Sequence, residues 1–222
     1  SDGPPRIALE PQGAPDWMAD AIVAGGGHVV PLSEAEALVW AAPRDPDGLR
    51  AALDAVPDLG WVQLPFAGIE PYAALLDDDR VWTCGKGVYA EPVAEMALAL
   101  ALAGMRHVAG YARTTGWSGP HGVNLLGANV TILGGGGITA SLLRLLAPFD
   151  CRITVVRNRV EEMVGADEVL GADRYVDALP DADVVFLALP LTPETEGMIS
   201  RSELEQMKRT AWIVNVARGG HI

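Results

Sequence analysis

The sequence predicts an α/β protein built from two doubly wound parallel sheets. Three observations lead to this class: short apolar strands alternate with helical patterns, a glycine turn joins one strand directly to a helix, and a long helical pattern divides the chain. Strands that alternate with helices are joined by crossovers and therefore form parallel sheets. We place the domain boundary just before the long helix, which gives a first domain of residues 1–88 and a second of residues 89–222.

The first domain contains the expected alternation. Its apolar segments predict five strands, at Arg6–Leu9, His28–Leu32, Ala37–Ala42, Trp61–Phe66 and Val81–Cys84. A helix is expected over Asp45–Val56, because Asp45 can cap it, Pro46 suits its first turn, and Leu49 and Leu53 fall on one face.

A single long helix is expected over Glu91–Thr114, where apolar residues run through a pattern long enough to form a spine between two domains. A polar, glycine-rich loop at Thr115–Asn124 follows it. Further apolar segments predict strands of the second domain at Val184–Leu189 and Trp212–Val216.

The most informative segment is a strand–turn–helix–strand unit in the second domain. The strand Val130–Leu133 leads into four glycines, then a helix with Ile138 on its apolar face, then a second strand at Ile153–Val156. Gly134 and Gly136 allow a tight turn in which a pyrophosphate approaches the backbone at a helix N-terminus. The unit therefore predicts dinucleotide binding, the alternative being a glycine loop in a flavodoxin-like fold that binds no nucleotide.

Two positions depart from the usual dinucleotide fingerprint. Thr139 occupies the place of the third glycine, and we expect it to loosen the packing of helix on strand slightly. After the second strand, Arg157 stands where an NAD site has Asp or Glu, with Arg159 close by. Guanidinium groups suit a 2′-phosphate, so NADP(H) is preferred and NAD(H) remains an option, unless both arginines are only solvated loop charges.

The overall composition excludes several classes. A net charge of −13 argues against a nucleic-acid surface and against binding to anionic membranes. The longest apolar run, Met96–Met105, is too short to span a bilayer. Cys84 and Cys151 are too few for a disulfide framework or a zinc site, so no metal is expected and the two thiols suit a reducing cytoplasm.

Four blocks of sequence carry a resemblance to a known family. They are VQLPFAGIEPY at Val62–Tyr72, PVAEMALALAL at Pro92–Leu102, the glycine turn, and LPLTPETEGMISRSELEQMKRTAWIVNVARGG at Leu189–Gly220. With nearly all of its residues taking part, the chain resembles the D-isomer-specific 2-hydroxyacid dehydrogenases, which also reduce 2-oxo acids. The resemblance implies a flavodoxin-like substrate domain, a Rossmann cofactor domain, and an active site in the cleft between them.

The resemblance also assigns roles to residues. Arg218 matches the arginine that binds the substrate carboxylate and polarises its carbonyl, the alternative being a surface arginine near the end of the chain. Ala67, Gly68 and Ile69 match the loop whose amides receive that carboxylate, or form an ordinary strand-to-helix turn. The cofactor contacts implied in the same way are Gly137, Ile138, Arg157, Leu189, Pro190, Val216, Ala217 and Arg218. Leu189 and Pro190 equally suit packing at a strand end.

The chain departs from the family near its end. The catalytic carboxylate and histidine of the family come later than Ile222, so we expect the printed chain to be a fragment or remnant with impaired activity and an exposed sheet edge. His221 is interpreted as a polar loop residue rather than a substitute. The alternative to an enzyme is a non-catalytic NAD(P)-binding sensor or corepressor-like module of the same fold.

Partners follow from the same resemblance. The ligand is expected to be a small 2-oxo or 2-hydroxy acid, and the family suggests a homodimer. The residues do not identify the acid, because Phe66, Tyr72, Lys86 and Tyr89 are all plausible pocket liners. Lys86 suits an anionic substrate tail and equally suits a solvated loop.

Overall fold

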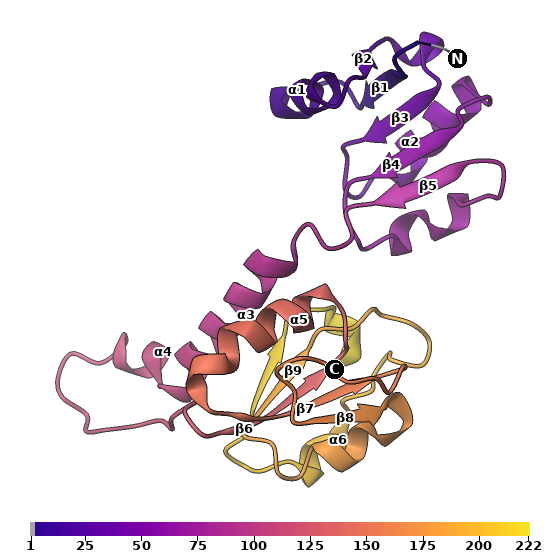
Figure 1. The fold of residues 1–222 in the computed structure, drawn as a ribbon. Coiled ribbons are helices and arrows are strands. Elements are labelled where there is room, and N and C mark those ends of the chain that lie inside the picture. Colours follow the sequence, from indigo (N-terminus) through magenta and orange to yellow (C-terminus); the bar gives the residue numbers. More distant parts are fainter. Residues whose placement is uncertain (1–2) are drawn as a thin grey trace. The chain divides into compact units, whose positions relative to one another are not determined.

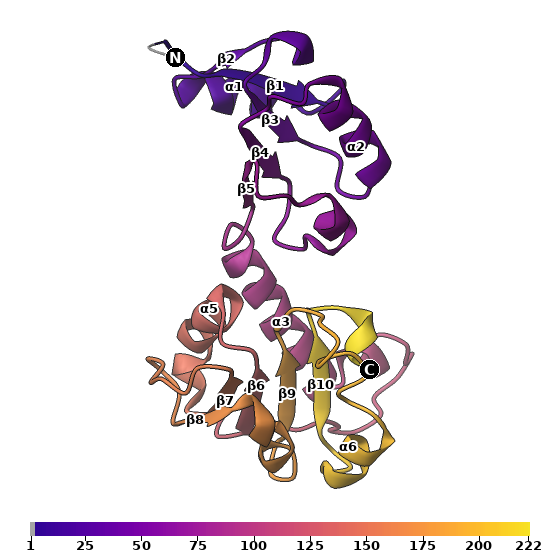
Figure 2. The same ribbon diagram turned by 90° about the vertical axis from the view of Figure 1, so that its right-hand side faces the viewer.

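The computed structural model describes residues 3–222. The chain divides into two compact units, one that ends at Val88 and one over Tyr89–Ile222. Each unit contains its own five-stranded parallel sheet (Figures 1 and 2). The predicted fold class, two doubly wound parallel α/β layers, is therefore confirmed.

The first unit has the strand order β2-β1-β3-β4-β5, which is the flavodoxin-like order. Its strands are β1 (Arg6–Glu10), β2 (His28–Val29), β3 (Ala37–Trp40), β4 (Trp61–Leu64) and β5 (Val81–Cys84). Its helices are α1 (Asp16–Ala24) and α2 (Pro46–Ala55), and its 3₁₀ turns are η1 (Leu32–Glu34) and η2 (Glu70–Leu75). All five predicted strands exist.

Local sequence explains where these elements begin and end. The Asp45 side chain accepts a hydrogen bond from the amide of Gly48 at 2.9 Å, which confirms the predicted cap of α2. The strand predicted over His28–Leu32 is too long, because β2 stops at Val29. Pro31, which has no N–H to offer a ladder, instead precedes the η1 turn.

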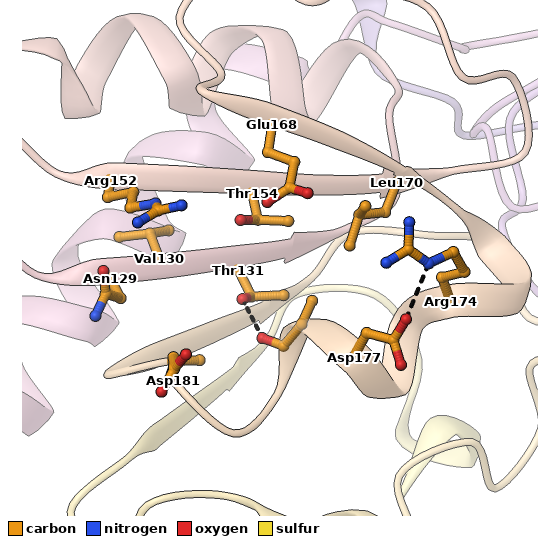
Figure 3. Close-up of a pocket in the computed structure, with 12 residues that line it drawn as sticks. Asn129, Val130, Thr131, Arg152, Thr154, Glu168, Leu170, Arg174, Asp177 and Asp181 are labelled. Atoms are coloured by element: carbon orange, nitrogen blue, oxygen red, sulfur yellow. Dashed lines mark hydrogen bonds and ion pairs between the residues drawn. The ribbon is translucent and has the colours of Figure 1, made fainter.

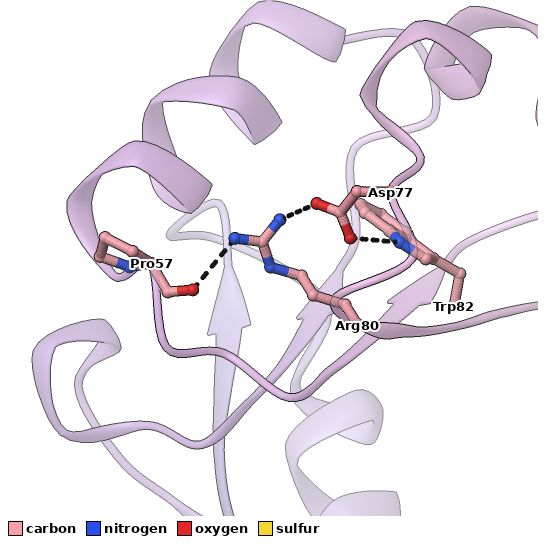
Figure 4. Close-up of polar contacts among 4 residues, drawn as sticks. All are labelled: Pro57, Asp77, Arg80 and Trp82. Carbon is pink, nitrogen blue, oxygen red and sulfur yellow. Dashed lines mark hydrogen bonds and ion pairs between the residues drawn. The ribbon is translucent and has the colours of Figure 1, made fainter.

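A polar cluster fastens β5 to the segment that follows α2. Arg80 donates from Nη2 to the carbonyl oxygen of Pro57 at 3.0 Å and pairs through Nη1 with Asp77 (Figure 4). The indole N–H of Trp82 donates to the other oxygen of Asp77 at 3.3 Å. The Arg80 side chain is only 13% exposed, so this pair is shielded from solvent far better than an ordinary surface ion pair.

The second unit has the strand order β10-β9-β6-β7-β8, with every neighbouring pair parallel. Its strands are β6 (Asn129–Leu133), β7 (Arg152–Arg157), β8 (Glu168–Gly171), β9 (Val184–Leu187) and β10 (Trp212–Asn215). Its helices are α3 (Ala90–Met105), α4 (Val108–Tyr111), α5 (Gly137–Leu146) and α6 (Arg201–Gln206), and its 3₁₀ turns are η3 (Ala147–Phe149), η4 (Ala172–Ala178) and η5 (Gly219–His221). The first strand, β6, lies between β7 and β9, so the order reverses between β6 and β9. In such sheets, ligands bind outside the carboxyl ends of the strands at this switch point.

Two apolar layers cover this sheet. On one face α3 and α5 lie side by side (Figure 1), where Ala94, Ala97 and Ala101 of α3 are fully buried against the sheet and α5. Small side chains on α3 allow the two helices to approach closely. On the other face Leu133, Val156, Leu187 and their neighbours pack beneath η4 and the segment before α6, including Leu179 and Ile199.

The long helix predicted over Glu91–Thr114 is wrong in its second half. Helix α3 ends at Met105, and His107 adopts a left-handed conformation with φ 57° before the short α4. The carbonyl oxygen of Met105 accepts a hydrogen bond from the amide of Val123 at 2.7 Å. In a longer helix, the carbonyl group of Met105 would accept a hydrogen bond from the helix's own backbone, but here it accepts one from a loop that returns to the helix end. The local sequence pattern does not reveal this long-range contact.

Strand β8 was missed by the sequence analysis, because only four residues, Glu168–Gly171, take part in it. It pairs with β7 in register from Thr154 opposite Glu168 to Arg157 opposite Gly171. Pairing with β7 thus makes this segment a strand, although its own apolar pattern is too weak to predict one.

Asp183 joins three strands at their amino ends. Its carboxylate accepts from the amide of Asn129 at 2.9 Å and from Lys208 Nζ at 2.8 Å, while its carbonyl oxygen accepts from the amide of Trp212 at 3.0 Å. Partial burial acts to raise the pKa of Asp183, but the hydrogen bonds from Lys208 and Asn129 outweigh it and leave the pKa lowered. The ionised carboxylate therefore contributes to the stability of the second unit.

We predict that Asp183→Asn lowers the free energy of unfolding by about 1–2 kcal/mol at neutral pH. The pKa of Asp183 is lower in the folded chain than in the unfolded chain, so its contribution is complete above the unfolded pKa of about 4 and disappears as the pH falls through the folded value. Urea unfolding at pH 7 and near pH 3 measures the difference, which should shrink in acid. Asp181→Asn, at an exposed neighbour, is the control. An equal loss at both pH values would show that the charge of Asp183 is not responsible.

Candidate dinucleotide site

The glycine turn after β6 is shaped by the approach of two strand ends. Gly134 has φ +114°, and a Cβ there would lie 2.3 Å from the carbonyl oxygen of Ala188, just after β9. Its amide donates to the carbonyl oxygen of Val156 in β7 at 2.8 Å. Only glycine fits both the backbone angle and the available space. The predicted turn therefore lies at the switch point of the sheet.

Thr139 corrects the expectation of looser packing at the third fingerprint position. Its side chain is fully buried in the first turns of α5, and Oγ1 donates to the carbonyl oxygen of Gly134 at 2.8 Å. The hydroxyl thus ties the helix to the turn. The N-cap residue is Gly136 and the helix begins at Gly137, so the first-turn amides, which have no intrahelical acceptors, emerge beside the turn.

A cavity of about 540 Å³ opens at the carboxyl ends of β6, β7 and β9. It is lined by Leu133, Gly134, Gly135, Val156, Arg157, Asn158, Ala172, Asp173, Tyr175, Leu189, Pro190, Thr192, Glu194, Thr195 and Met198. Four of the predicted cofactor residues are among them, namely Gly134, Arg157, Leu189 and Pro190. The cavity is large enough for a substantial part of a dinucleotide, and its position matches the ligand site of doubly wound sheets.

The remaining predicted cofactor residues lie elsewhere in the second unit. Of the described residues, Gly136, Gly137, Ile138, Arg159, Val216, Ala217 and Arg218 are not among those that line the cavity. The first three continue the same turn into α5. Arg157 is half-buried at the end of β7, whereas Arg159 is exposed in the bend that follows. These assignments stay predictions.

Sequence reasoning missed the part of the cavity wall that follows Pro190. Thr192, Glu194 and Thr195 belong to the motif quoted for the resemblance, which could have drawn attention to them. The amide of Thr192 donates to Thr195 Oγ1 at 2.8 Å, and that hydroxyl donates to the carbonyl oxygen of Pro190 at 2.9 Å. The wall is therefore a loop folded on itself.

Asp173 and Tyr175 of η4 complete the cavity, and no local motif identified them. The Tyr175 hydroxyl donates to the carbonyl oxygen of Met198 at 3.1 Å. Burial raises the pKa of Tyr175, and the nearby Glu203 carboxylate raises it further, so the phenol remains protonated and can donate. Asp173 and Glu194 bring negative charge to a cavity whose positive group is Arg157.

Arg218 lies just after β10, in a turn shaped by Asn215. The Asn215 side chain accepts from the amide of Ala217 at 3.0 Å and donates to the carbonyl oxygen of Arg218 at 2.8 Å. The Arg218 side chain is exposed, and its Nη1 donates to the carbonyl oxygen of Ala217 at 3.0 Å. The arginine is thus presented at the carboxyl end of the sheet, the same end as the cavity.

His221 is not the polar loop residue that the sequence suggested. Its side chain is fully buried, with Nδ1 2.9 Å from the carbonyl oxygen of Thr195 and Nε2 3.3 Å from that of Leu189. Backbone bonds from Gly197 to Gly220 at 2.8 Å and from Ile199 to His221 at 2.9 Å reinforce the contact. His221 therefore fastens the segment carrying Arg218 to the loop that forms the cavity wall.

In the first unit, Ala67, Gly68 and Ile69 follow the carboxyl end of β4 and precede η2. Ala67 is exposed, and Gly68 and Ile69 are half-buried. The carbonyl oxygen of Ile69 accepts from the amide of Tyr72 at 2.8 Å, which starts the η2 turn. The loop occupies the edge of a doubly wound sheet where ligands usually bind, and its predicted role in holding substrate stays a prediction.

A second, smaller cavity of about 210 Å³ lies toward the amino-terminal half of the strands in the second unit (Figure 3). Thr131 Oγ1 donates there to the carbonyl oxygen of Ala178 at 2.7 Å, and Arg174 pairs with Asp177 at 2.9 Å. Two pairs of its polar groups are thus bonded to each other, and the cavity lies away from the carboxyl ends of the strands, where these sheets bind ligands.

Among residues 3–222, side chains of His, Cys, Asp and Glu form no group of three or more suited to a metal ion. Over the same range, every helix is too short or too polar to cross a membrane.

The strand order, the glycine turn at the switch point and the adjoining cavity define a Rossmann dinucleotide-binding unit. The family model described as the D-isomer specific 2-hydroxyacid dehydrogenase NAD binding domain matches residues 96–222. The chain therefore belongs to the D-isomer specific 2-hydroxyacid dehydrogenase family, and its second unit carries the NAD-binding domain, as the sequence resemblance indicated.

Individual relatives agree with this membership. An uncharacterized protein in the proB 3′ region of Corynebacterium melassecola is 34% identical over 212 residues, which cover 90% of this chain and 67% of that protein. A glyoxylate reductase of Aeropyrum pernix is 36% identical over 148 residues, 60% of this chain and 43% of that enzyme. The chain thus spans two thirds of the first relative and under half of the second.

A solved structure shows the same fold. The D-isomer specific 2-hydroxyacid dehydrogenase from Xanthobacter autotrophicus Py2, crystallised in complex with NADPH and MES, matches with a TM-score of 0.81 and 21% identity. The match covers 99% of this chain and 74% of that chain. Because the matching family model describes dehydrogenases and the relative from Aeropyrum pernix is described as a glyoxylate reductase, a non-catalytic sensor module is not favoured.

We predict that His221→Ala lowers the free energy of unfolding by about 2–3 kcal/mol, because it removes a fully buried side chain together with its hydrogen bond to a half-buried carbonyl group, that of Thr195 or of Leu189. Exchange of the Gly197 and Ile199 amide hydrogens should also become faster, since both donate to this segment. Urea unfolding and hydrogen exchange measure the two effects. His28→Ala, at an exposed histidine of β2, should change stability by less than about 0.5 kcal/mol. Unchanged exchange at both amides would show that His221 does not hold the loop.

Proposed function

We propose that the whole protein is an NAD(P)-dependent 2-oxo acid reductase, equivalently a D-2-hydroxyacid dehydrogenase. The observation that carries the proposal is the cavity at the switch point of a sheet whose last strand presents Arg218 at the same end. The bound nicotinamide supplies or accepts the hydride at C2 of the acid. The relative from Aeropyrum pernix is described as a glyoxylate reductase, which supports a small 2-oxo acid as substrate.

The residues of this chain have distinct roles in the proposal. The glycine turn and the first turn of α5 hold the pyrophosphate, because their amides and the helix N-terminus favour negative charge. Gly137, Ile138, Leu189 and Pro190 are the proposed neighbours of the cofactor. Val216 and Ala217 are the residues that would contact the nicotinamide, and Ala67–Ile69 would offer amides to a substrate carboxylate.

Arg218 is proposed to bind the carboxylate of the 2-oxo acid and to stabilise the negative charge that develops on its carbonyl oxygen. A guanidinium presents several donors in a fixed plane and stays charged at all working pH values, which suits both tasks. Its turn is already ordered by Asn215, so little conformational entropy is lost when substrate binds. The proton that completes the reduction requires a separate acid.

NADP(H) is the proposed preferred cofactor. Arg157 supports this preference, because it lines the cavity at the end of β7, where an acidic residue would bind the 2′-hydroxyl of NAD. Asp173 and Glu194 disfavour a phosphate on their own side of the cavity, so Arg157 must supply the binding energy. The solved relative crystallised with NADPH is consistent with such a site in this fold.

A homodimer is proposed as the assembly. Apolar side chains exposed on α3 and α4 support it, among them Met96 at 56%, Leu100 at 46% and Val108 at 51%. A cytoplasmic location is proposed as well, and the free thiols of Cys84 and Cys151 agree with a reducing compartment.

We predict that Arg218→Gln lowers kcat/KM of the whole protein for glyoxylate by about 10²–10³-fold, because the developing oxyanion loses its charged donor. The affinity for NADPH should change by less than about twofold. Arg209→Gln, at another exposed arginine, is the matched control and should leave kcat/KM unchanged. The rate is followed by the absorbance of reduced nicotinamide. A wild-type protein that binds NADPH but turns over neither glyoxylate nor bulkier 2-oxo acids would contradict the proposed activity.

We predict that Arg157→Asp shifts cofactor preference toward NADH by about 10–100-fold, since the 2′-phosphate loses a charge-assisted contact and meets a like charge. Calorimetric titration of the purified 222-residue chain with each reduced cofactor measures the ratio of dissociation constants. Arg159→Asp makes the same change of charge two residues later, outside the cavity. A shift of equal size in both variants would show that Arg157 does not set the preference by its position in the cavity.

A further inference from the structure

The glycines of the turn after β6 have different physical reasons to be glycine. Gly134 needs a positive φ and the absence of a side chain. Gly136 has an extended backbone, and a Cβ there would have open space around it. Gly135 also lies outside the positive-φ region, yet a Cβ there would lie 2.8 Å from Cβ, Cδ and Nε of Arg157. The neighbour that requires glycine at position 135 is therefore the arginine.

These three contacts describe how Arg157 lies. Cβ at the base of the side chain, Cδ further along it and Nε at the start of the guanidinium group are equally close to a Cβ built at Gly135. The Arg157 side chain therefore lies flat across the peptide of Gly135. Both residues line the 540 Å³ cavity. The flat arrangement keeps the guanidinium beside the phosphate-binding turn instead of extended into solvent.

The backbone at Arg157 has little freedom to move away. Residue 157 ends β7, which is paired with β6 through Val156 opposite Leu133 and with β8 through Arg157 opposite Gly171. The amide of Gly134 also donates to the carbonyl oxygen of Val156 at 2.8 Å. Because the strand is held on both sides, a methyl group at position 135 must turn Cδ and Nε of Arg157 away, and the peptide of Gly135 must shift to clear Cβ of Arg157.

We propose that Gly135 is a specificity-determining position, whose missing side chain places the Arg157 guanidinium where it binds the 2′-phosphate of NADP(H). The inference rests on the proposed preference for NADP(H) and adds the residue that makes Arg157 effective. Asp173 and Glu194 line the same cavity, so an arginine displaced toward them pairs with carboxylates rather than with the phosphate. A side chain at position 135 therefore weakens NADPH binding and leaves NADH binding nearly unchanged.

The test is the ratio of the dissociation constants of NADH and NADPH, measured by calorimetry on the purified chain. Gly135→Ala should lower this ratio about tenfold relative to wild type. Gly136→Ala is the matched control in the same turn, because its Cβ meets open space and any hindrance of the shared pyrophosphate affects both cofactors equally. It should change the ratio by less than about twofold.

A double-mutant cycle with Arg157→Gly assigns the effect to the arginine. Arg157→Gly should abolish the preference, and adding Gly135→Ala to it should change the ratio no further. If Gly135→Ala alone prevents folding, the double variant should restore the thermal unfolding midpoint toward that of Arg157→Gly, since all three close atoms are gone. Failure of this rescue would overturn the inference.

The results of these experiments distinguish the role of Gly135 from the proposed role of Arg157, on which it rests. A preference for NADPH that disappears in Arg157→Gly but persists in Gly135→Ala would overturn the role of Gly135 alone. A wild-type chain with no preference, or a preference that survives Arg157→Gly, would overturn the proposed role of Arg157 and the role of Gly135 with it.

Discussion

The second unit depends on the close approach of two strand ends, those of β6 and β9, at the point where the strand order reverses. Gly134 lies there, with its α-carbon so near the carbonyl group of Ala188 that no side chain fits. The same turn donates to β7 through its amide and accepts from Thr139 of α5. One residue thus fixes the start of the helix, the spacing of the strands and the rim of the cavity.

Tertiary hydrogen bonds then join segments that are remote in the sequence. Thr139 holds α5 to the turn, and Asp183 joins β6, β9 and the segment before β10 at the opposite end of the sheet. His221 fastens the turn carrying Arg218 to the loop of the cavity wall. In each case a buried or half-buried polar side chain meets its partners, so its loss leaves other groups unsatisfied.

The sequence predicted the strands and the turn well because their signals are local. Apolar alternation and glycine or proline punctuation placed nine of the strands, and Asp45 and Pro46 marked the start of α2. The predictions were wrong where a contact between residues far apart in the sequence determines the secondary structure. Met105 ends α3 because its carbonyl group accepts from Val123, and β8 exists because it pairs with β7. Neither partner is visible in a local window.

What the sequence by itself determined is the fold class, the family and the position of the dinucleotide site, because glycine, proline and apolar periodicity act through the local backbone. What only the tertiary structure decided is how side chains meet around that site. The Arg157 side chain lies across the peptide of Gly135, Tyr175 of η4 lines the cavity, and the His221 side chain is buried rather than exposed. The physical reason is that such contacts depend on the packing of strands and loops far apart in the chain, and burial and hydrogen-bond geometry exist only after that packing has formed.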